Sequence, residues 1–191
     1  SIGDVEGGLQ PKRKVSHYEH NPIKEADKVC NDYINREGIT LHFADADRAF
    51  YNPSCDTVQV PPSTSYSNLA GYYSTLFHEL THSTGHPNRL NRIKSTSFFG
   101  NTEYSKEELV AEVGANMIMS ALGIENNAAQ KNSIAYLQGW LQALKNDMTM
   151  IISACSKAQK AAGYILEHNE ECSAKSLSSQ ISPSGRTGTI V

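Results

Sequence analysis

The sequence predicts one α+β domain in which a small N-terminal β-sheet is followed by helices. Two observations lead to this prediction: short β-type runs are confined to the first third of the chain, and helical periodicity dominates after Pro62. The 191 residues, 39% of them hydrophobic, suffice for a single core. We expect the domain to span 21–168, with a flexible lead-in or linker at 1–20 and a disordered tail at 169–191.

The N-terminal part alternates between apolar runs and turn signals. A helical segment at 23–36 gives way near Gly38 to β-type runs. The predicted strands cover 39–43, 48–51 and 57–60. Asn52-Pro53-Ser54 and Pro61-Pro62-Ser63 separate and end these runs, because proline fixes its own φ and lacks the N–H donor that a strand or helix uses.

After the second proline turn the apolar spacing is helical. The first stripe consists of Leu69, Tyr72, Tyr73, Leu76 and Leu80. Gly85 stands where a helix C-cap glycine is expected. The next helix is predicted to begin with Ser105 as N-cap, with Glu108 at capping-box spacing, and to run to Gly123. Two further stripes predict helices at 134–144 and 151–165.

Charge, cysteines and hydropathy exclude several classes of function. The net charge of -3 gives no overall attraction to nucleic acid or an anionic membrane, and we interpret Lys12-Arg13-Lys14, Arg89, Arg92 and Lys94 as solvated surface charge. No apolar run approaches the roughly 20 residues of a membrane helix. Four scattered cysteines and the lack of a signal-like segment favour a cytoplasmic location.

The sequence His78-Glu79-Leu80-Thr81-His82 lies within the first of these later helices. Residues four apart project from the same face of a helix, so the two imidazoles can bind one ion, and neutral imidazole suits Zn²⁺. Glu79 follows the first histidine directly and can take a proton from water that the metal activates. The pattern therefore predicts a zinc site with His78 and His82 as ligands and Glu79 as general base.

A catalytic zinc normally takes three protein ligands, and the following helix offers acidic residues. Glu108 and Glu112 share a face that also carries the small residues Ala111 and Ala115, which favour close packing against the first helix. Spacing alone does not decide which of the two carboxylates is the ligand. Glu107 is expected to be an exposed acid in the first turn, favoured by the helix dipole. The arrangement is similar to the gluzincin branch of the zincins, which implies Glu108 as third ligand and Glu112 as the partner that orients an imidazole.

Other polar residues could border the site. His86 follows Gly85 immediately, which does not fit the spacing of a third histidine ligand in metzincins. We therefore interpret His86 as either a wall residue of the active site or a plain loop histidine. His86, Tyr104 and Tyr72 are the candidate donors for an oxyanion.

Several separated blocks occur in an order that is more specific than the histidine motif alone. They are Tyr51-Asn52-Pro53, Val60-Pro61, Tyr72 to His82, Thr84-Gly85-His86, Arg89-Leu90, Glu107 to Glu112, Tyr136 to Leu141 and Ala158 to Ala162. Across about residues 24–167, the chain resembles the C-terminal zincin-like metallopeptidase domain of ArdC-type antirestriction proteins. Ser83 departs from the pattern, since many relatives carry tryptophan there.

This resemblance implies a domain carried on plasmids and other mobile elements. It implies a zinc-dependent metallopeptidase that hydrolyses a protein or peptide substrate, with single-stranded DNA bound through a separate N-terminal domain that these 191 residues do not include. The alternative is a non-catalytic, metal-stabilised binding module that acts on DNA or restriction components. The two hypotheses differ in whether Glu79 is required.

Overall fold

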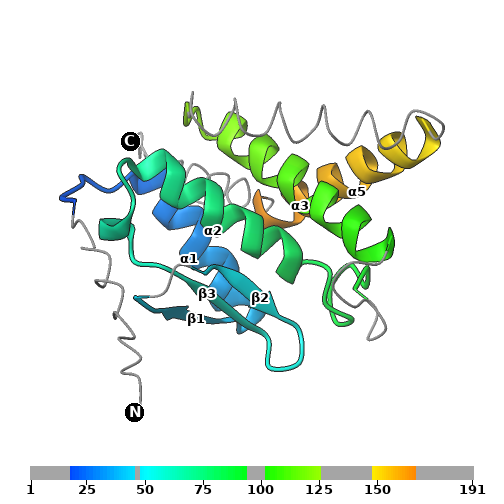
Figure 1. Ribbon diagram of the computed structural model, residues 1–191, viewed down its shortest axis with the longest axis horizontal. Coiled ribbons are helices and arrows are strands. Elements are labelled where there is room, and N and C mark those ends of the chain that lie inside the picture. The colour runs from blue at the N-terminus through cyan, green and yellow to red at the C-terminus, as the bar shows by residue number, and fades with distance from the viewer. Residues whose placement is uncertain (1–17, 46–47, 94–101, 126–147, 167–191) are drawn as a thin grey trace, which may run out of the picture.

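In the computed structural model, a three-stranded sheet lies at one end of the molecule, with helices packed over it (Figure 1). The structure describes residues 18–45, 48–93, 102–125 and 148–166. The helices are α1 (Lys24–Glu37), α2 (Leu69–Ser83), α3 (Thr102–Ala121) and α5 (Met148–Leu166); the strands are β1 (Thr40–Phe43), β2 (Phe50–Asn52) and β3 (Thr57–Val60); η1 (Ser63–Ser65) is a short 3-10 turn. The predicted α+β class is confirmed.

Helix α1 forms because its apolar residues recur at helical spacing. The buried stripe consists of Ala26, Val29, Cys30, Tyr33 and Ile34. The helix ends at Gly38, whose φ of 70° lies in the left-handed region and whose N–H donates to the Ile34 carbonyl. The bounds differ from the predicted 23–36 by one residue at each end.

The sheet has the strand order β1-β3-β2. β1 runs parallel to β3, whereas β2 is antiparallel to β3 and forms an edge of the sheet. Val58 and Val60 of the central strand are fully buried and belong to the same core as α1 and α2. Because side chains alternate along a strand, Thr57 and Gln59 lie on the opposite face of the sheet.

Helix α2 is the central element of the molecule, in contact with β2, β3, α3 and α5. The Asn68 side chain caps its first turn by accepting a hydrogen bond from the Gly71 N–H at 2.8 Å. The helix ends at Ser83 with Thr84 as C-cap. The predicted C-cap role of Gly85 is wrong: its φ is not left-handed, and the residue is small because Ile93 packs within 2.8 Å of where a Cβ would lie.

Helix α3 packs closely against α2. A Cβ on Gly114 would lie 2.7 Å from Thr81 Cγ2, so the two backbones approach at a position where only glycine fits. Ala111 and Ala115 are buried, as their small size predicted. The helix begins at Thr102, so Ser105 lies inside its first turns and is not the N-cap.

Several predictions fall outside the described residues. These are residues 1–17 of the lead-in predicted at 1–20, with Lys12-Arg13-Lys14 among them, and Lys94, the helix at 134–144 and the whole tail predicted at 169–191. Among the residues that the structure does describe, no helix is long and apolar enough to cross a membrane. The domain limits 1–20, 21–168 and 169–191 stay a prediction.

Candidate metal centre

Helix α2 brings the two motif histidines together. Because His78 and His82 are one turn apart, their rings lie on one face, with 4.8 Å between the ring centroids and 3.2 Å between the two Nε2 atoms. Both side chains are partly exposed on the side of α2 that faces α3. The helix therefore presents two nitrogen ligands pointing at a common position.

Glu108 of α3 reaches the same position. Its Oε2 lies 3.6 Å from His78 Nε2 and its Oε1 lies 3.4 Å from His82 Nε2. Tetrahedral zinc with bonds of about 2.0–2.1 Å separates its ligand atoms by about 3.3–3.4 Å. The three side chains form the group of described residues that could hold a metal ion, with ligand atoms all within 4.8 Å of one another. The donor set thus fits one ion and leaves a coordination position open.

Glu112 lies one turn further along α3 and contacts the other nitrogen of His78. Its Oε2 is 3.4 Å from His78 Nδ1. A carboxylate at Nδ1 accepts the ring proton, so it fixes the tautomer in which Nε2 is free to bind a metal. The structure therefore distinguishes the two carboxylates, which spacing alone could not: Glu108 lies at the two Nε2 atoms, and Glu112 lies at Nδ1 of His78.

The prediction that Glu107 is an exposed acid is wrong. Only 16% of its side chain is exposed, and Oε1 lies 3.7 Å from His82 Nδ1. Arg92 pairs with both of its oxygens, at 2.7 and 3.1 Å. Helix α3 begins at Thr102, before the predicted N-cap Ser105, so Glu107 is not in the exposed first turn and instead faces α2.

Glu79 is buried next to the two histidines, with 7% of the residue exposed. Burial raises the pKa of its carboxyl group, although the neighbouring His82 and His78 lower it in part. The backbone N–H of Tyr51 on β2 also acts on this carboxyl group and lowers its pKa. The carboxyl group therefore lies between the metal-binding face of α2 and the edge strand β2.

The carboxylates determine the protonation of the metal-free histidines. Burial lowers the pKa of His78, but the hydrogen bonds to Glu108 and Glu112 raise it more, to about 10. Burial likewise lowers the pKa of His82, and Glu107 and Glu108 raise it above its ordinary value. Two imidazoles surrounded by carboxylates form a site whose charge suits a divalent cation.

The three candidate oxyanion donors lie in different surroundings. Tyr72 is buried in the main core, edge-on to Tyr66 and Tyr73, and is not part of the metal-ligand group. His86 is half-buried beyond the end of α2, and its Nδ1 accepts the Asn88 N–H at 3.2 Å. The side chain of Tyr104 lies outside the described residues.

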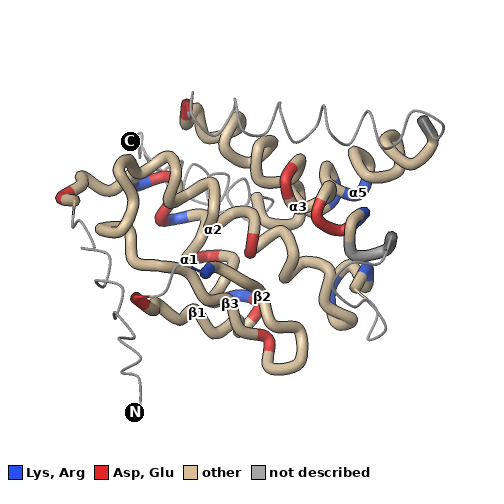
Figure 2. Tube along the Cα trace, in the orientation of Figure 1, with Lys and Arg blue, Asp and Glu red and all other residues tan. Residues whose placement is uncertain are grey.

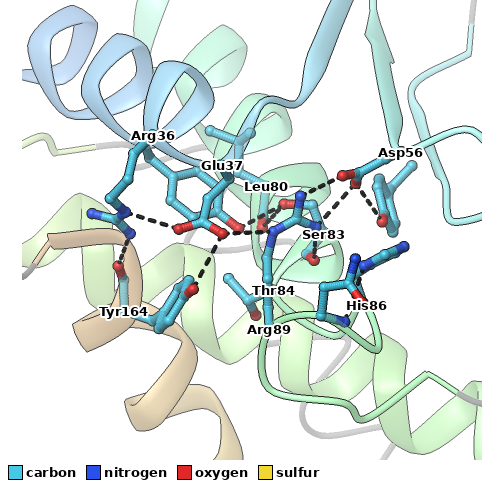
Figure 3. A network of polar contacts seen from close by, with 12 residues as sticks. Arg36, Glu37, Asp56, Leu80, Ser83, Thr84, His86, Arg89 and Tyr164 are labelled. Atoms are coloured by element: carbon cyan, nitrogen blue, oxygen red, sulfur yellow. Dashed lines mark hydrogen bonds and ion pairs between the residues drawn. The ribbon is translucent and has the colours of Figure 1, made fainter.

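The interpretation of Arg89 and Arg92 as solvated surface charge is also wrong. The Arg89 side chain is only 3% exposed and lies between Glu37 of α1 and Asp56 of the β2–β3 turn (Figure 3). It binds both oxygens of Asp56 and donates to the Ser83 carbonyl at 2.8 Å. Tyr51 donates to the same Asp56 carboxylate, so Arg89 joins the edge strand to the end of α2.

Ser83 is fully buried beside this arginine. Its hydroxyl lies 3.0 Å from the Tyr33 hydroxyl and donates to the Leu80 carbonyl. The side chain thus contacts α1 and the core.

Sequence reasoning missed the burial of Glu107 and Arg92 beside the metal ligands and the approach of the Tyr51 backbone to Glu79. A partial signal existed for the arginine, since Arg89 and Arg92 follow the motif helix closely and acidic residues follow in turn. Figure 2 shows that Lys and Arg are dispersed over the chain and not gathered along one element, so charge alone could not single out the buried pair.

An α+β domain whose central helix carries HExxH, with a glutamate supplied by the next long helix, is a metal-binding domain of the zincin-like class. Consistent with this class, the zincin-like metallopeptidase family matches residues 28–157. The chain therefore belongs to the zincin-like metallopeptidase family.

Relatives include two DNA primases and an uncharacterized bacterial protein. Two DNA primase TraC proteins of Escherichia coli are 32% and 37% identical over 169 and 134 residues, covering 88% and 70% of this chain. Protein y4eC of Sinorhizobium fredii is 32% identical over 165 residues, or 86% of this chain. The chain spans only 11% and 12% of the TraC proteins and 51% of y4eC.

Solved structures of a plasmid antirestriction ArdC protein are also similar. The Mn(II)-bound structure matches with a TM-score of 0.63 and 36% identity, over 84% of this chain and 57% of ArdC. The metal-free structure matches with a TM-score of 0.60 and 36% identity, over 81% of this chain and 53% of ArdC. These matches confirm the predicted resemblance to the ArdC-type zincin-like domain.

Proposed function

We propose that the chain is a zinc-dependent peptidase domain of an antirestriction or plasmid-transfer type protein, working in the cytoplasm. The observation that carries this proposal is the convergence of the His78 and His82 Nε2 atoms with the Glu108 carboxylate, with buried Glu79 beside them. Three ligands and an adjacent carboxyl group are the set that metal-assisted hydrolysis needs.

In this proposal His78, His82 and Glu108 hold zinc, and Glu112 fixes the ring of His78. Bound zinc would supply a Lewis acid that polarises a carbonyl and makes water more acidic near neutral pH. Glu79 is the proton carrier: it takes a proton from the attacking water and gives it to the leaving amine. Its raised pKa supports both steps, because a carboxyl group with a pKa closer to neutral both accepts and returns a proton readily.

The position of β2 supports an extended peptide as the substrate. β2 pairs with β3 along one edge only within the described residues, and it lies against α2. The backbone of Tyr51 on this strand lowers the pKa of Glu79, so the strand lies close to that carboxyl group. A peptide added to such an edge would gain main-chain hydrogen bonds and pass beside the carboxyl group.

Replacing the general base tests this proposal. Zinc-loaded chain should cleave a denatured protein such as casein, and Glu79→Gln should lose that cleavage while keeping one bound zinc by elemental analysis. Glu125→Gln is the matched control, because Glu125 is exposed. Cleavage by Glu79→Gln at the rate of the control would refute the catalytic role. A His78→Ala/His82→Ala double variant should lose the metal.

A second candidate is a non-catalytic, metal-stabilised module that acts on DNA or restriction components. It is favoured by the identity of the relatives, which include a DNA primase and an antirestriction protein, and by the chain spanning only part of each. In that case Glu79→Gln would keep full antirestriction or binding activity, and only loss of the ligands would abolish it. Gel shift with single-stranded DNA measures the binding directly.

A further inference from the structure

The loop after α2 places a buried arginine behind the metal-binding face. The Arg92 side chain is 8% exposed. It donates to the Thr81 carbonyl at 2.9 Å and to the Thr84 hydroxyl at 2.8 Å, both at the end of α2. Because these partners belong to the helix that carries His82, the guanidinium keeps a fixed position relative to that histidine.

The remaining donors of Arg92 hold Glu107. Nε and Nη2 form a fork on its two oxygens, at 3.1 and 2.7 Å. The oxygen that accepts the shorter bond is also the one 3.7 Å from His82 Nδ1. Glu107 is thus fixed from one side by the arginine and faces the ring nitrogen that the metal site does not use.

We propose that Arg92 is a positioning residue for the metal centre: through Glu107 it sets the ring orientation and tautomer of His82. The two histidines then have different partners at Nδ1: Glu112, which Asn116 also contacts, lies at His78, and the Arg92–Glu107 pair lies at His82. A planar fork fixes a carboxylate in a way that a single charge does not, so the identity of residue 92 matters beyond its charge. This inference rests on the metal site of the proposed function but not on peptide cleavage.

Metal affinity measured with Co(II) and Zn(II) tests this role without an activity assay. Outer partners of ligand histidines contribute about 10–100-fold in metal affinity, so Arg92→Met should weaken binding by about that factor in a chelator competition. The visible absorption of bound Co(II) should change as well, because it reports ligand geometry. Arg92→Lys should recover only part of the affinity. Arg48→Met is the matched control, since Arg48 is exposed.

A double-variant cycle separates positioning from a general loss of stability. Glu107→Gln keeps the shape of the side chain and should also weaken binding, and Arg92→Met should cause little further loss in its presence, because both act through one contact. If either single variant is folded and binds Co(II) with unchanged affinity and spectrum, the inference is overturned. If Arg92→Met fails to fold, Glu107→Gln decides. A wild-type chain that binds neither metal would instead refute the proposed function.

Discussion

Substituting Gly114 by alanine should separate α2 from α3 and so disturb the metal centre. The added Cβ would lie 2.7 Å from Thr81 Cγ2, whereas carbon atoms in contact are normally about 3.5–4.0 Å apart. Thr81 is fully buried, β-branched, and holds its hydroxyl on the Phe77 carbonyl at 2.7 Å. Since that side chain cannot turn away, the helices must move apart by about 1 Å.

The expected effect is larger on metal binding than on stability. Overpacking costs about 1–3 kcal/mol, and alanine regains about 1 kcal/mol of helix propensity over glycine, so the net loss is about 0–2 kcal/mol. Metal–ligand distances, in contrast, tolerate only about 0.2 Å. A shift of about 1 Å at Gly114, on the helix that carries Glu108, should therefore lower metal affinity by at least about tenfold.

Chelator competition and urea unfolding of Gly114→Ala measure the two effects. Thr81→Ser removes the clashing methyl group and keeps the hydroxyl, which would then be the nearest atom at 3.2 Å. Adding Thr81→Ser should restore much of the affinity that Gly114→Ala loses. Gly71→Ala is the control, because its Cβ would meet nothing closer than 3.4 Å. Wild-type affinity in Gly114→Ala would refute the argument that this contact sets the helix spacing.

Three further predictions concern the protonation of His78, the ion pairs of Arg89 and the backbone of Gly38. Because carboxylates outweigh burial and raise the pKa of His78 to about 10, metal binding must release its proton, so apparent affinity should rise by about tenfold per pH unit from pH 7 to 9. Flat affinity in competition titrations would contradict this expectation. In the metal-free chain the same group adds stability that is complete below its ordinary pKa of 6.5 and is lost as the pH rises toward 10. Arg89→Met should cost about 2–3 kcal/mol in urea unfolding, less than for a fully buried pair because Asp56 is 27% exposed. Burial raises the pKa of Asp56 and of Glu37, but their partners lower each below its ordinary value, so this difference should shrink as the pH falls below about 4, and a constant difference would refute the ion-pair origin. Gly38→Ala should cost about 1–2 kcal/mol because of its φ of 70°, and a neutral result in the same assay would exclude strain there.

The elements that sequence patterns predicted well are those whose formation depends on local interactions. The buried stripe of α1 and the spacing of His78 and His82 follow from helical periodicity, which is a property of neighbouring residues. β3 has the predicted bounds because turn residues flank a short apolar run. The predicted start of α3 is too late in the chain, because Ser105 and Glu108 have the spacing of a capping box although both lie inside a helix that begins at Thr102.

By itself the sequence determined the α+β class, the family blocks and the two histidines with their neighbouring Glu79, because each of these is written in the order and spacing of residues. Only the tertiary structure decided that Glu108 faces the two Nε2 atoms, that Glu112 lies behind His78, and that Arg92 is buried against Glu107. The physical reason is that spacing along α3 says which side chains share a face but not how that face is rotated and seated against α2. That seating depends on close contacts between residues far apart in the chain.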